Sequence, residues 1–373
     1  MTTRRRFLAG SAAALTVAPL AGRAQAQAGA FAQVDAVISA QVAKLGGSGM
    51  IAVVKDRRLV HAAGFGGMDP KDRYRVFSLS KSITGLAVAK LAAEGKLDLD
   101  QPISRYVGAA LQKYGPPADS RVPNVTVRQT MIHMGGFASN EREDDPVILG
   151  KDRFVPPKGR ERDPRSWRKE DVLPSILKRQ LDAPPGTQYI YSNAGYVILG
   201  LIVEAASGRS YEDYCREAVF KPAGLPLPTI EPDRRYVDSV SGWQMTPAEV
   251  MKMWAVYEPD DTRVLTPEMR QQVVAPTPAF INEQRRSYYT YGICFQEFRP
   301  GSFIWFHTGR NQFGPKDQQL VTFATHGPTI SMVWAVRPAL NFQGLTALDR
   351  DLWVALRAVT DWPAHDLYPQ YGF

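Results

Sequence analysis

The residues with the clearest potential for chemistry are a serine and a lysine three positions apart. Ser78-Leu79-Ser80-Lys81 opens a long apolar stretch, and on a helix this spacing places the hydroxyl and the ammonium on one face. A lysine beside a serine can activate the alcohol as a nucleophile. The same S-x-x-K pattern also occurs at 166–169 and at 175–178, so the pattern alone does not choose among the three.

The surrounding sequence favours Ser78. Two apolar runs around a polar turn at 55–58 predict a β-hairpin over residues 49–66. The segment from Ser78 to Leu97 predicts a buried helix, because it is rich in Ala and Leu over most of its circumference. Ser78 then stands at the N-terminal end, where free amide groups favour negative charge. The other two matches lie in a charged segment typical of solvated surface. The alternative interpretation of Ser78 is a helix cap that happens to precede a lysine.

Two further motifs follow later in the chain. Tyr191-Ser192-Asn193 lies inside PPGTQYIYSNAGYVILG, and His307-Thr308-Gly309 ends an aromatic run at 302–306. A phenol and a side-chain amide this close in sequence can take part in proton transfer and in orienting a lysine. Considered alone, Tyr191 is equally well explained as a core aromatic beside Tyr189 and Tyr196.

With the three motifs in this order, the chain resembles the serine β-lactamase-like superfamily, in particular its branch of class C β-lactamases, DD-peptidases and family VIII carboxylesterases. The resemblance extends over nearly the whole mature chain and includes the runs 95–100, 127–137 and 185–187. It implies an α/β (α+β) fold of the β-lactamase/transpeptidase type. It also implies two groups of site residues, catalytic Ser78, Lys81 and Tyr191, and substrate-binding Asn193, His307, Thr308, Gly309 and Arg310.

The expected mechanism is attack of the Ser78 hydroxyl on a carbonyl carbon to form an acyl-enzyme. Lys81 is within reach across one helical turn, and a lysine ammonium beside Tyr191 would favour its phenolate. The two groups would then share the proton, with Asn193 orienting Lys81. The resemblance places the oxyanion hole at the backbone amides of Ser78 and Arg310.

Several residues depart from the family pattern and leave the substrate open. His307 stands where class C β-lactamases usually carry lysine, Met134-Gly135-Gly136 replaces Thr-Ser-Gly, and 310–314 replaces a Gly-rich run. The prediction is a serine hydrolase that cleaves an ester or amide, carboxylesterase-like, with a small-molecule or peptide-like substrate. The alternatives are a class C-type β-lactamase, a DD-peptidase, or a penicillin-recognising binding protein with little turnover. His133 is predicted to be either a structural hydrogen-bonding residue or a catalytic one.

The elements predict one domain of two lobes. A sheet lobe is expected from 29–97 together with 285–373, and a mainly helical lobe from 98–284 is inserted between its two parts. Helices are expected over 31–45 and 345–359, with strands over 288–298, 303–307, 318–325 and 330–336. The charged, Pro-rich segment 138–184 is either a solvated loop or a lid over the substrate.

Composition excludes several classes of function. With 44% hydrophobic residues the chain can build a core. The formal charge of +8 falls to about +4 without four N-terminal arginines, which is too little to indicate nucleic-acid binding. The sequence has no Gly-rich phosphate loop, H-E-x-x-H or paired-cysteine spacing, so no metal or cofactor is expected. The absence of G-x-S-x-G argues against an α/β-hydrolase.

The N-terminus predicts export. Arg4 and Arg5 lie in a twin-arginine pattern, followed by a modest apolar stretch and by small-x-small cleavage sites after Ala26 and Ala28. Residues 1–28 are therefore predicted to be a signal peptide and 29–373 the mature domain. The stretch is too short to anchor the chain stably in a bilayer. The expected partner is the twin-arginine export machinery, and the expected compartment is the bacterial periplasm.

Replacing Arg4 and Arg5 by lysine should trap the precursor in the cytoplasm. A receptor reads the twin-arginine pair, so a change that preserves charge and hydropathy should still block export. Fractionation followed by immunoblotting measures this. An unchanged periplasmic yield would point instead to the general secretory route.

Overall fold

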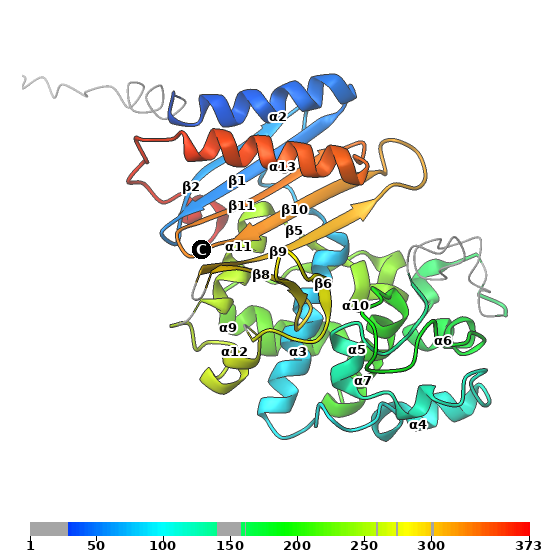
Figure 1. Ribbon diagram of the computed structural model, residues 1–373. Coiled ribbons are helices and arrows are strands. Elements are labelled where there is room, and N and C mark those ends of the chain that lie inside the picture. The colour runs from blue at the N-terminus through cyan, green and yellow to red at the C-terminus, as the bar shows by residue number, and fades with distance from the viewer. Residues whose placement is uncertain (1–28, 140–157, 161, 259, 274, 300–301) are drawn as a thin grey trace, which may run out of the picture.

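The computed structural model describes residues 29–139, 158–160, 162–258, 260–273, 275–299 and 302–373. The predicted signal peptide lies outside this set, as do residues 140–157 and 161 of the segment 138–184, which was predicted to be either a solvated loop or a lid. Eight strands form one antiparallel sheet in the order β2-β1-β11-β10-β9-β8-β7-β6, and a helical lobe lies against one side of it (Figure 1). This is the predicted α/β (α+β) architecture.

The strands of the main sheet are β1 (Ser48–Lys55), β2 (Arg58–Phe65), β6 (Phe280–Asn282), β7 (Ser287–Tyr289), β8 (Cys294–Arg299), β9 (Ser302–Asn311), β10 (Leu320–His326) and β11 (Ile330–Arg337). A second, three-stranded sheet has the order β3-β5-β4. Its strands are β3 (Tyr74–Arg75), β4 (Thr229–Ile230) and β5 (Trp243–Met245).

The helices of the sheet lobe are α2 (Ala32–Leu45) and α13 (Phe342–Arg357) at the two ends of the described chain. Those between them are α3 (Ser80–Ala93), α4 (Ser104–Lys113), α5 (Val127–Met131), α6 (Lys169–Leu177), α7 (Asn193–Ser207), α8 (Tyr211–Cys215), α9 (Lys221–Ala223), α10 (Asp238–Ser241), α11 (Pro247–Trp254) and α12 (Pro267–Val273).

The sheet joins the two ends of the chain. β1 pairs with β11 along its whole length, from Ser48 opposite Arg337 to Lys55 opposite Ile330. β1 and β2 form the predicted hairpin, and both of its turn residues, Asp56 and Arg57, have positive φ angles of 47° and 64°. A two-residue turn of this kind matches the twist of the flanking strands.

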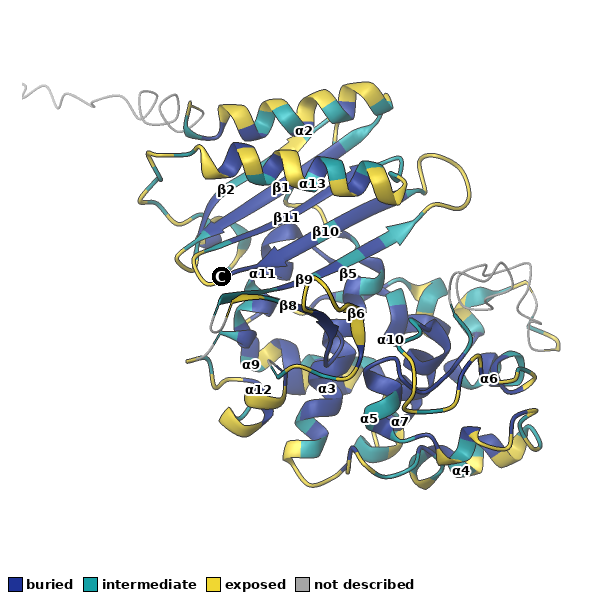
Figure 2. Ribbon diagram, viewed as in Figure 1, coloured by how far each residue is buried: buried dark blue, intermediate teal, exposed yellow. Residues whose placement is uncertain are grey.

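Helices α2 and α13 cover one face of the sheet, with their exposed sides turned to solvent (Figure 2). Their buried side chains join those of the sheet in one apolar cluster, which includes Val34, Ile38, Val42, Ile51, Val53, Trp334, Leu345, Leu348, Leu352 and Leu356. The closing helix begins at Phe342 rather than at the predicted Leu345. The reason is an N-cap, because the Asn341 side chain accepts a hydrogen bond from the Gly344 amide.

The predicted strand over 288–298 is divided into β7 and β8 by a turn. Gly292 in this turn has a φ of +80°, which disfavours any other residue. A Cβ at Gly292 would also collide with the backbone carbonyl of Lys81. The turn therefore rests directly on α3, and this contact explains why the strand is interrupted.

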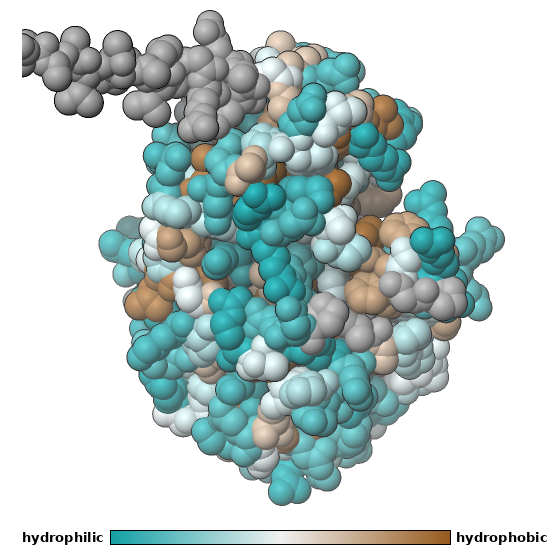
Figure 3. All heavy atoms as spheres, turned by 90° about the vertical axis from the view of Figure 1, so that its left-hand side faces the viewer, coloured by the Kyte–Doolittle hydropathy of each residue, from teal (hydrophilic) through white to brown (hydrophobic). Residues whose placement is uncertain are grey.

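The segment 98–284, predicted to be a helical lobe, also contributes to the sheet. α11 packs against β1, β10 and β11, and β6 forms one edge of the sheet. The helical lobe proper is built around α3 and α7, whose residues are mostly buried (Figure 2). Figure 3 shows a face of the molecule that is mainly hydrophilic with scattered apolar side chains. Among the described helices, none has the length and apolar character needed to cross a bilayer.

Candidate active site

Ser78 lies in a 3₁₀ turn, η1 (Phe77–Leu79), directly before α3 rather than in its first turn. Phe77 has a left-handed φ of +48°, which costs about 1–3 kcal/mol and persists only where the surroundings enforce it. Phe77 and Leu79 are buried, whereas Ser78 between them is partly exposed. The turn therefore holds the serine hydroxyl at the surface of an otherwise closed core.

Lys81 is fully buried and points toward Ser78. Its Nζ lies 3.1 Å from Ser78 Oγ, 2.8 Å from Asn193 Oδ1 and 3.3 Å from the backbone carbonyl of Val240. Helix α3 is buried on nearly every side, and Lys81 is among its fully buried residues. Polar contacts replace water around the amine, as a buried lysine requires.

Tyr191 and Asn193 reach this site from the start of α7. Lys81 Nζ lies 4.9 Å from the centroid of the Tyr191 ring, and the Tyr191 and His307 rings are 6.2 Å apart. Asn193 is the first residue of α7, so its side chain leaves the end of the helix toward Lys81. The structure thus brings together five of the predicted residues, Ser78, Lys81, Tyr191, Asn193 and His307.

His133 supports the backbone on both sides of Tyr191. Its carbonyl accepts a hydrogen bond from the Ile190 amide at 2.8 Å, and its Nδ1 accepts one from the Ser192 amide at 3.1 Å. Burial, with help from nearby Lys81 and His307, holds the pKa of His133 well below its usual value. A neutral imidazole that accepts at Nδ1 fits the structural role, the first of the two predicted for it.

His307 is neutral for reasons visible in its contacts. Its Nδ1 lies 2.9 Å from the Thr308 carbonyl oxygen, which can only accept, so Nδ1 carries the proton. Its Nε2 then accepts from the Tyr289 hydroxyl at 3.1 Å. Burial and the charge of Lys81 lower the pKa of His307 to about 3, against the opposing hydrogen bond to Thr308. No sequence signal marked Tyr289 as its partner.

Strand β9 lies against the serine turn through Gly309. A Cβ at Gly309 would collide with the Val76 carbonyl oxygen and with the Leu79 side chain, so only glycine allows this approach. β8 pairs with β9 only as far as Phe306. Beyond that point β9 packs against the serine turn η1.

The side chains of Thr308 and Arg310 lie on the other face of the sheet. Paired residues in an antiparallel sheet share a face, and Arg310 is opposite Val321, which packs in the cluster under α2 and α13. The strand continues through Asn311, so alternation also places Thr308 on that face. The structure therefore does not bring these two predicted substrate-binding side chains to the face that carries His307.

The rejected S-x-x-K matches have different surroundings. Lys169 is buried and its Nζ contacts Asp238, while Ser166 Oγ donates to the Asp163 carbonyl. The segment is thus less solvated than predicted, because Lys169 finds carboxylate partners inside the lobe. Ser175 lies within α6. Within the described residues, no group of three His, Cys, Asp or Glu side chains is arranged to hold a metal ion.

Comparisons with known proteins identify the family and the fold. A family model described as Beta-lactamase matches residues 34–332. Protein flp of Staphylococcus aureus (strain MW2) is 24% identical over 260 residues, which covers 61% of this chain and 48% of that protein. The chain therefore spans about half the length of this curated relative.

Two solved structures share the fold. The D-stereospecific amidohydrolase from Streptomyces sp. superposes with a TM-score of 0.68 at 18% identity, covering 89% of this chain and 99% of that one. EstCE1, a hydrolase with promiscuous acyltransferase activity, superposes with a TM-score of 0.67 at 17% identity and the same coverage. At these identities the likeness establishes the common fold.

Proposed function

Because this chain belongs to the beta-lactamase family of serine hydrolases, we propose that it cleaves an ester or amide through an acyl intermediate on Ser78. The observation that carries the proposal is the position of Lys81 Nζ, 3.1 Å from Ser78 Oγ and 2.8 Å from Asn193 Oδ1. The Tyr191 ring lies beside the same amine. A nucleophile, a base and a group that orients the base are the components that acyl transfer needs.

In the proposed first step, Ser78 Oγ attacks the substrate carbonyl carbon and gives its proton to the Lys81 and Tyr191 pair. The tetrahedral oxyanion is stabilised by the amides of Ser78 and Arg310. The pair then returns the proton to the leaving alcohol or amine as the carbonyl–leaving group bond breaks. In the second step, water gives a proton to the pair, attacks the acyl-Ser78 ester and releases the acid, while Ser78 regains its hydrogen.

Two features support a neutral substrate over one with a carboxylate. A lysine at position 307 would be a permanent cation that can hold an anion, but His307 is neutral, with its pKa lowered to about 3 by burial and Lys81. Arg310 projects from the opposite face of the sheet. The fold-related EstCE1 is described as a hydrolase with acyltransferase activity, and an esterase of this chain would use the same acyl chemistry.

We expect kcat/KM for p-nitrophenyl butyrate to equal or exceed that for mono-p-nitrophenyl succinate, its analogue with a free carboxylate. Among the described residues we identify no arginine on the face that carries His307, and the neutral His307 cannot replace one, so the charged group would lose hydration without compensation. For the same reason, hydrolysis of nitrocefin should be weak or absent. Spectrophotometric assays of both esters on one preparation measure the ratio.

Arg310→Ala is the matched control and should leave the ratio of the two esters unchanged. A preference of about tenfold or more for the carboxylate, roughly 1.4 kcal/mol of transition-state binding, would overturn the esterase proposal. If Arg310→Ala then removed that preference, a peptidase or β-lactamase function would replace it.

A further inference from the structure

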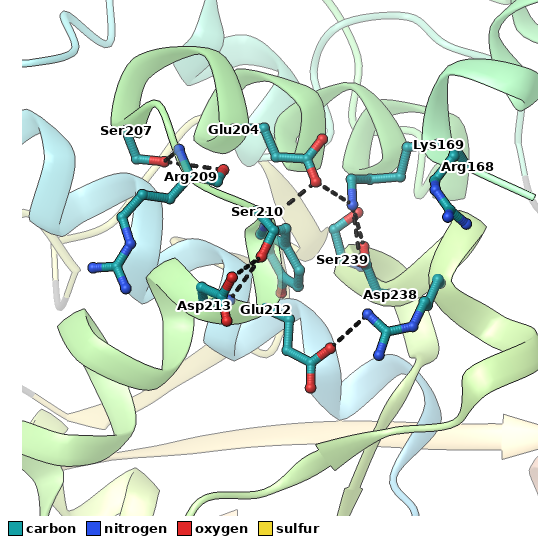
Figure 4. A network of polar contacts seen from close by, with 12 residues as sticks. Arg168, Lys169, Glu204, Ser207, Arg209, Ser210, Glu212, Asp213, Asp238 and Ser239 are labelled. Carbon is teal, nitrogen blue, oxygen red and sulfur yellow. Dashed lines mark hydrogen bonds and ion pairs between the residues drawn. The ribbon is translucent and has the colours of Figure 1, made fainter.

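An ionic cluster in the helical lobe joins two buried residues, Lys169 and Asp238, to the partly exposed Glu204. Lys169 Nζ contacts both carboxylate oxygens of Asp238, at 2.9 and 2.8 Å, and Glu204 Oε1 at 2.8 Å. Figure 4 shows the lysine side chain from α6 extending between these two carboxylates, which come from α7 and α10. None of the three residues touches Ser78 or Lys81 in the described contacts, so the chemistry proposed above leaves the cluster unexplained.

The lobe is shaped to accept this lysine. The side chains of Lys169 and Asp238 are only 5% and 6% exposed. A Cβ at Gly200 on α7 would collide with Lys169 Cδ and with Ser239 Oγ, so a glycine is needed where the lysine passes. Burial opposes the ammonium, yet attraction to Asp238 and Glu204 outweighs it and raises the pKa of Lys169. Burial raises the pKa of Asp238 to about 6, with Lys169 opposing the rise.

Stability alone is a weak explanation for such a cluster. Desolvation of buried charges commonly cancels their attraction, and apolar replacements of similar volume are often as stable. A role in fixing a geometry is the better-founded alternative. The geometry in question is that of α10, because Asp238 is its first residue and Asp238 Oδ1 accepts a hydrogen bond from the Ser239 amide at 2.6 Å.

Helix α10 connects the cluster to the catalytic lysine. Hydrogen bonds link Ser239 to both neighbouring helices. Its carbonyl accepts from Thr84 Oγ1 of α3 at 2.7 Å, and its hydroxyl donates to the Tyr196 carbonyl of α7 at 2.8 Å. The next residue, Val240, offers its carbonyl to Lys81 Nζ at 3.3 Å. Asp238 and Lys81 are therefore joined through two residues of backbone.

The Val240 carbonyl matters for the position of the lysine amine. Lys81 Nζ lies 3.3 Å from this carbonyl and 2.8 Å from Asn193 Oδ1, and these two acceptors help to hold it 3.1 Å from Ser78 Oγ. If α10 shifted, the amine would lose one of these acceptors and could move away from the serine. Misplacement of a base by about 1 Å can cost about a hundredfold in rate.

We propose that Asp238, held by Lys169 and Glu204, is a positioning residue that fixes the Val240 carbonyl against Lys81 and so keeps the lysine amine beside Ser78. The proposal rests on the proposed function of Ser78 and Lys81. The proposal also assigns a role to Lys169, the lysine of the S-x-x-K sequence at 166–169. This lysine forms an ion pair and does not serve as the base of a nucleophilic serine.

The test is the second-order rate at which a fluorophosphonate labels Ser78 in the full mature chain. Asp238→Asn preserves the side-chain shape and leaves Lys169 paired with Glu204, so the protein should fold. We expect labelling to slow about tenfold or more, and kcat for a p-nitrophenyl ester to fall with KM little changed. If Asp238 served only to stabilise the fold, Asp238→Asn would lower the melting temperature but would not lower kcat at an unchanged KM.

Two controls match this variant. Glu212→Gln removes a carboxylate whose described ion pairs are with Arg216 and Arg235 rather than with α10, and this variant should label at the wild-type rate. Asn193→Ala removes the other acceptor of Lys81, so the double variant with Asp238→Asn should lose clearly less than the product of the two single losses.

A second variant keeps the test decisive if Asp238→Asn does not fold. Gly200→Ala displaces Lys169 and Ser239 without removing any polar group, and it should slow labelling similarly. Its control is Gly108→Ala in α4, where an added Cβ meets nothing within 4 Å. Labelling of a folded Asp238→Asn within about twofold of wild type overturns the proposal, as does failure of both variants to fold. If wild-type Ser78 is not labelled at all, the proposed function itself fails.

Discussion

Ser78→Ala abolishes hydrolysis of p-nitrophenyl esters and labelling by a fluorophosphonate, while the protein remains folded. We expect this result because no other described serine has a lysine amine at hydrogen-bond distance with a second acceptor to orient it. The substitution removes the contact of Lys81 with the serine hydroxyl, while Asn193 and Val240 still hold the amine in place. Mass spectrometry of the labelled peptide and a thermal melt measure the two parts of the prediction.

Ser166→Ala and Ser175→Ala are the matched controls, because they remove the serines of the other two S-x-x-K sequences. Both variants should keep wild-type labelling. Label that persists in Ser78→Ala, or that maps to either of the other serines, would show that a different nucleophile is used.

Lys81→Ala and Tyr191→Phe should each lower kcat by about a thousandfold, or roughly 4 kcal/mol of transition-state stabilisation. The double variant should lose little more than either single variant. The reason is that the lysine amine and the phenol lie together, with Nζ 4.9 Å from the Tyr191 ring centroid. Groups that handle one proton as a unit are strongly non-additive.

Steady-state kinetics of the wild type, the two single variants and the double variant completes the double-mutant cycle. The KM values show whether substrate binding is retained. Tyr196→Phe is a useful control, because Tyr196 is also within 5.5 Å of Lys81 Nζ but its hydroxyl donates to the Met131 carbonyl. It should retain most activity. Losses that multiply in the double variant would mean that Lys81 and Tyr191 act independently, and the shared-proton mechanism would be wrong.

The sequence was sufficient to predict the fold and several of the residues that lie together in the candidate site. Ser78, Lys81, Tyr191, Asn193 and His307 belong to short motifs whose order follows the family, and the structure gathers them in one place. The same information predicted the hairpin and the two terminal helices, because their apolar periodicity and turn residues are local signals.

The residues that hold the site in shape could not be predicted in this way. His133 acts through hydrogen bonds to the backbone around Tyr191, and Tyr289 acts through its contact with His307. Val240 contributes only a carbonyl oxygen, which any residue type would supply. These roles depend on which segments meet in three dimensions. The side-chain direction of Arg310 likewise needed the register of β9 with β10.

The pairing of β1 with β11 has a consequence for synthesis of the chain. Residues 48–55 leave the ribosome long before residues 330–337, and until then the β1–β2 hairpin has no neighbour on its inner edge. A lone hairpin is at best marginally stable in water, and contacts between such distant segments form slowly and leave the chain open to aggregation. The sheet that carries His307 can therefore close around the serine turn only after β11 has been translated. We expect a nascent chain that lacks β11 to be inactive, because its sheet cannot yet form.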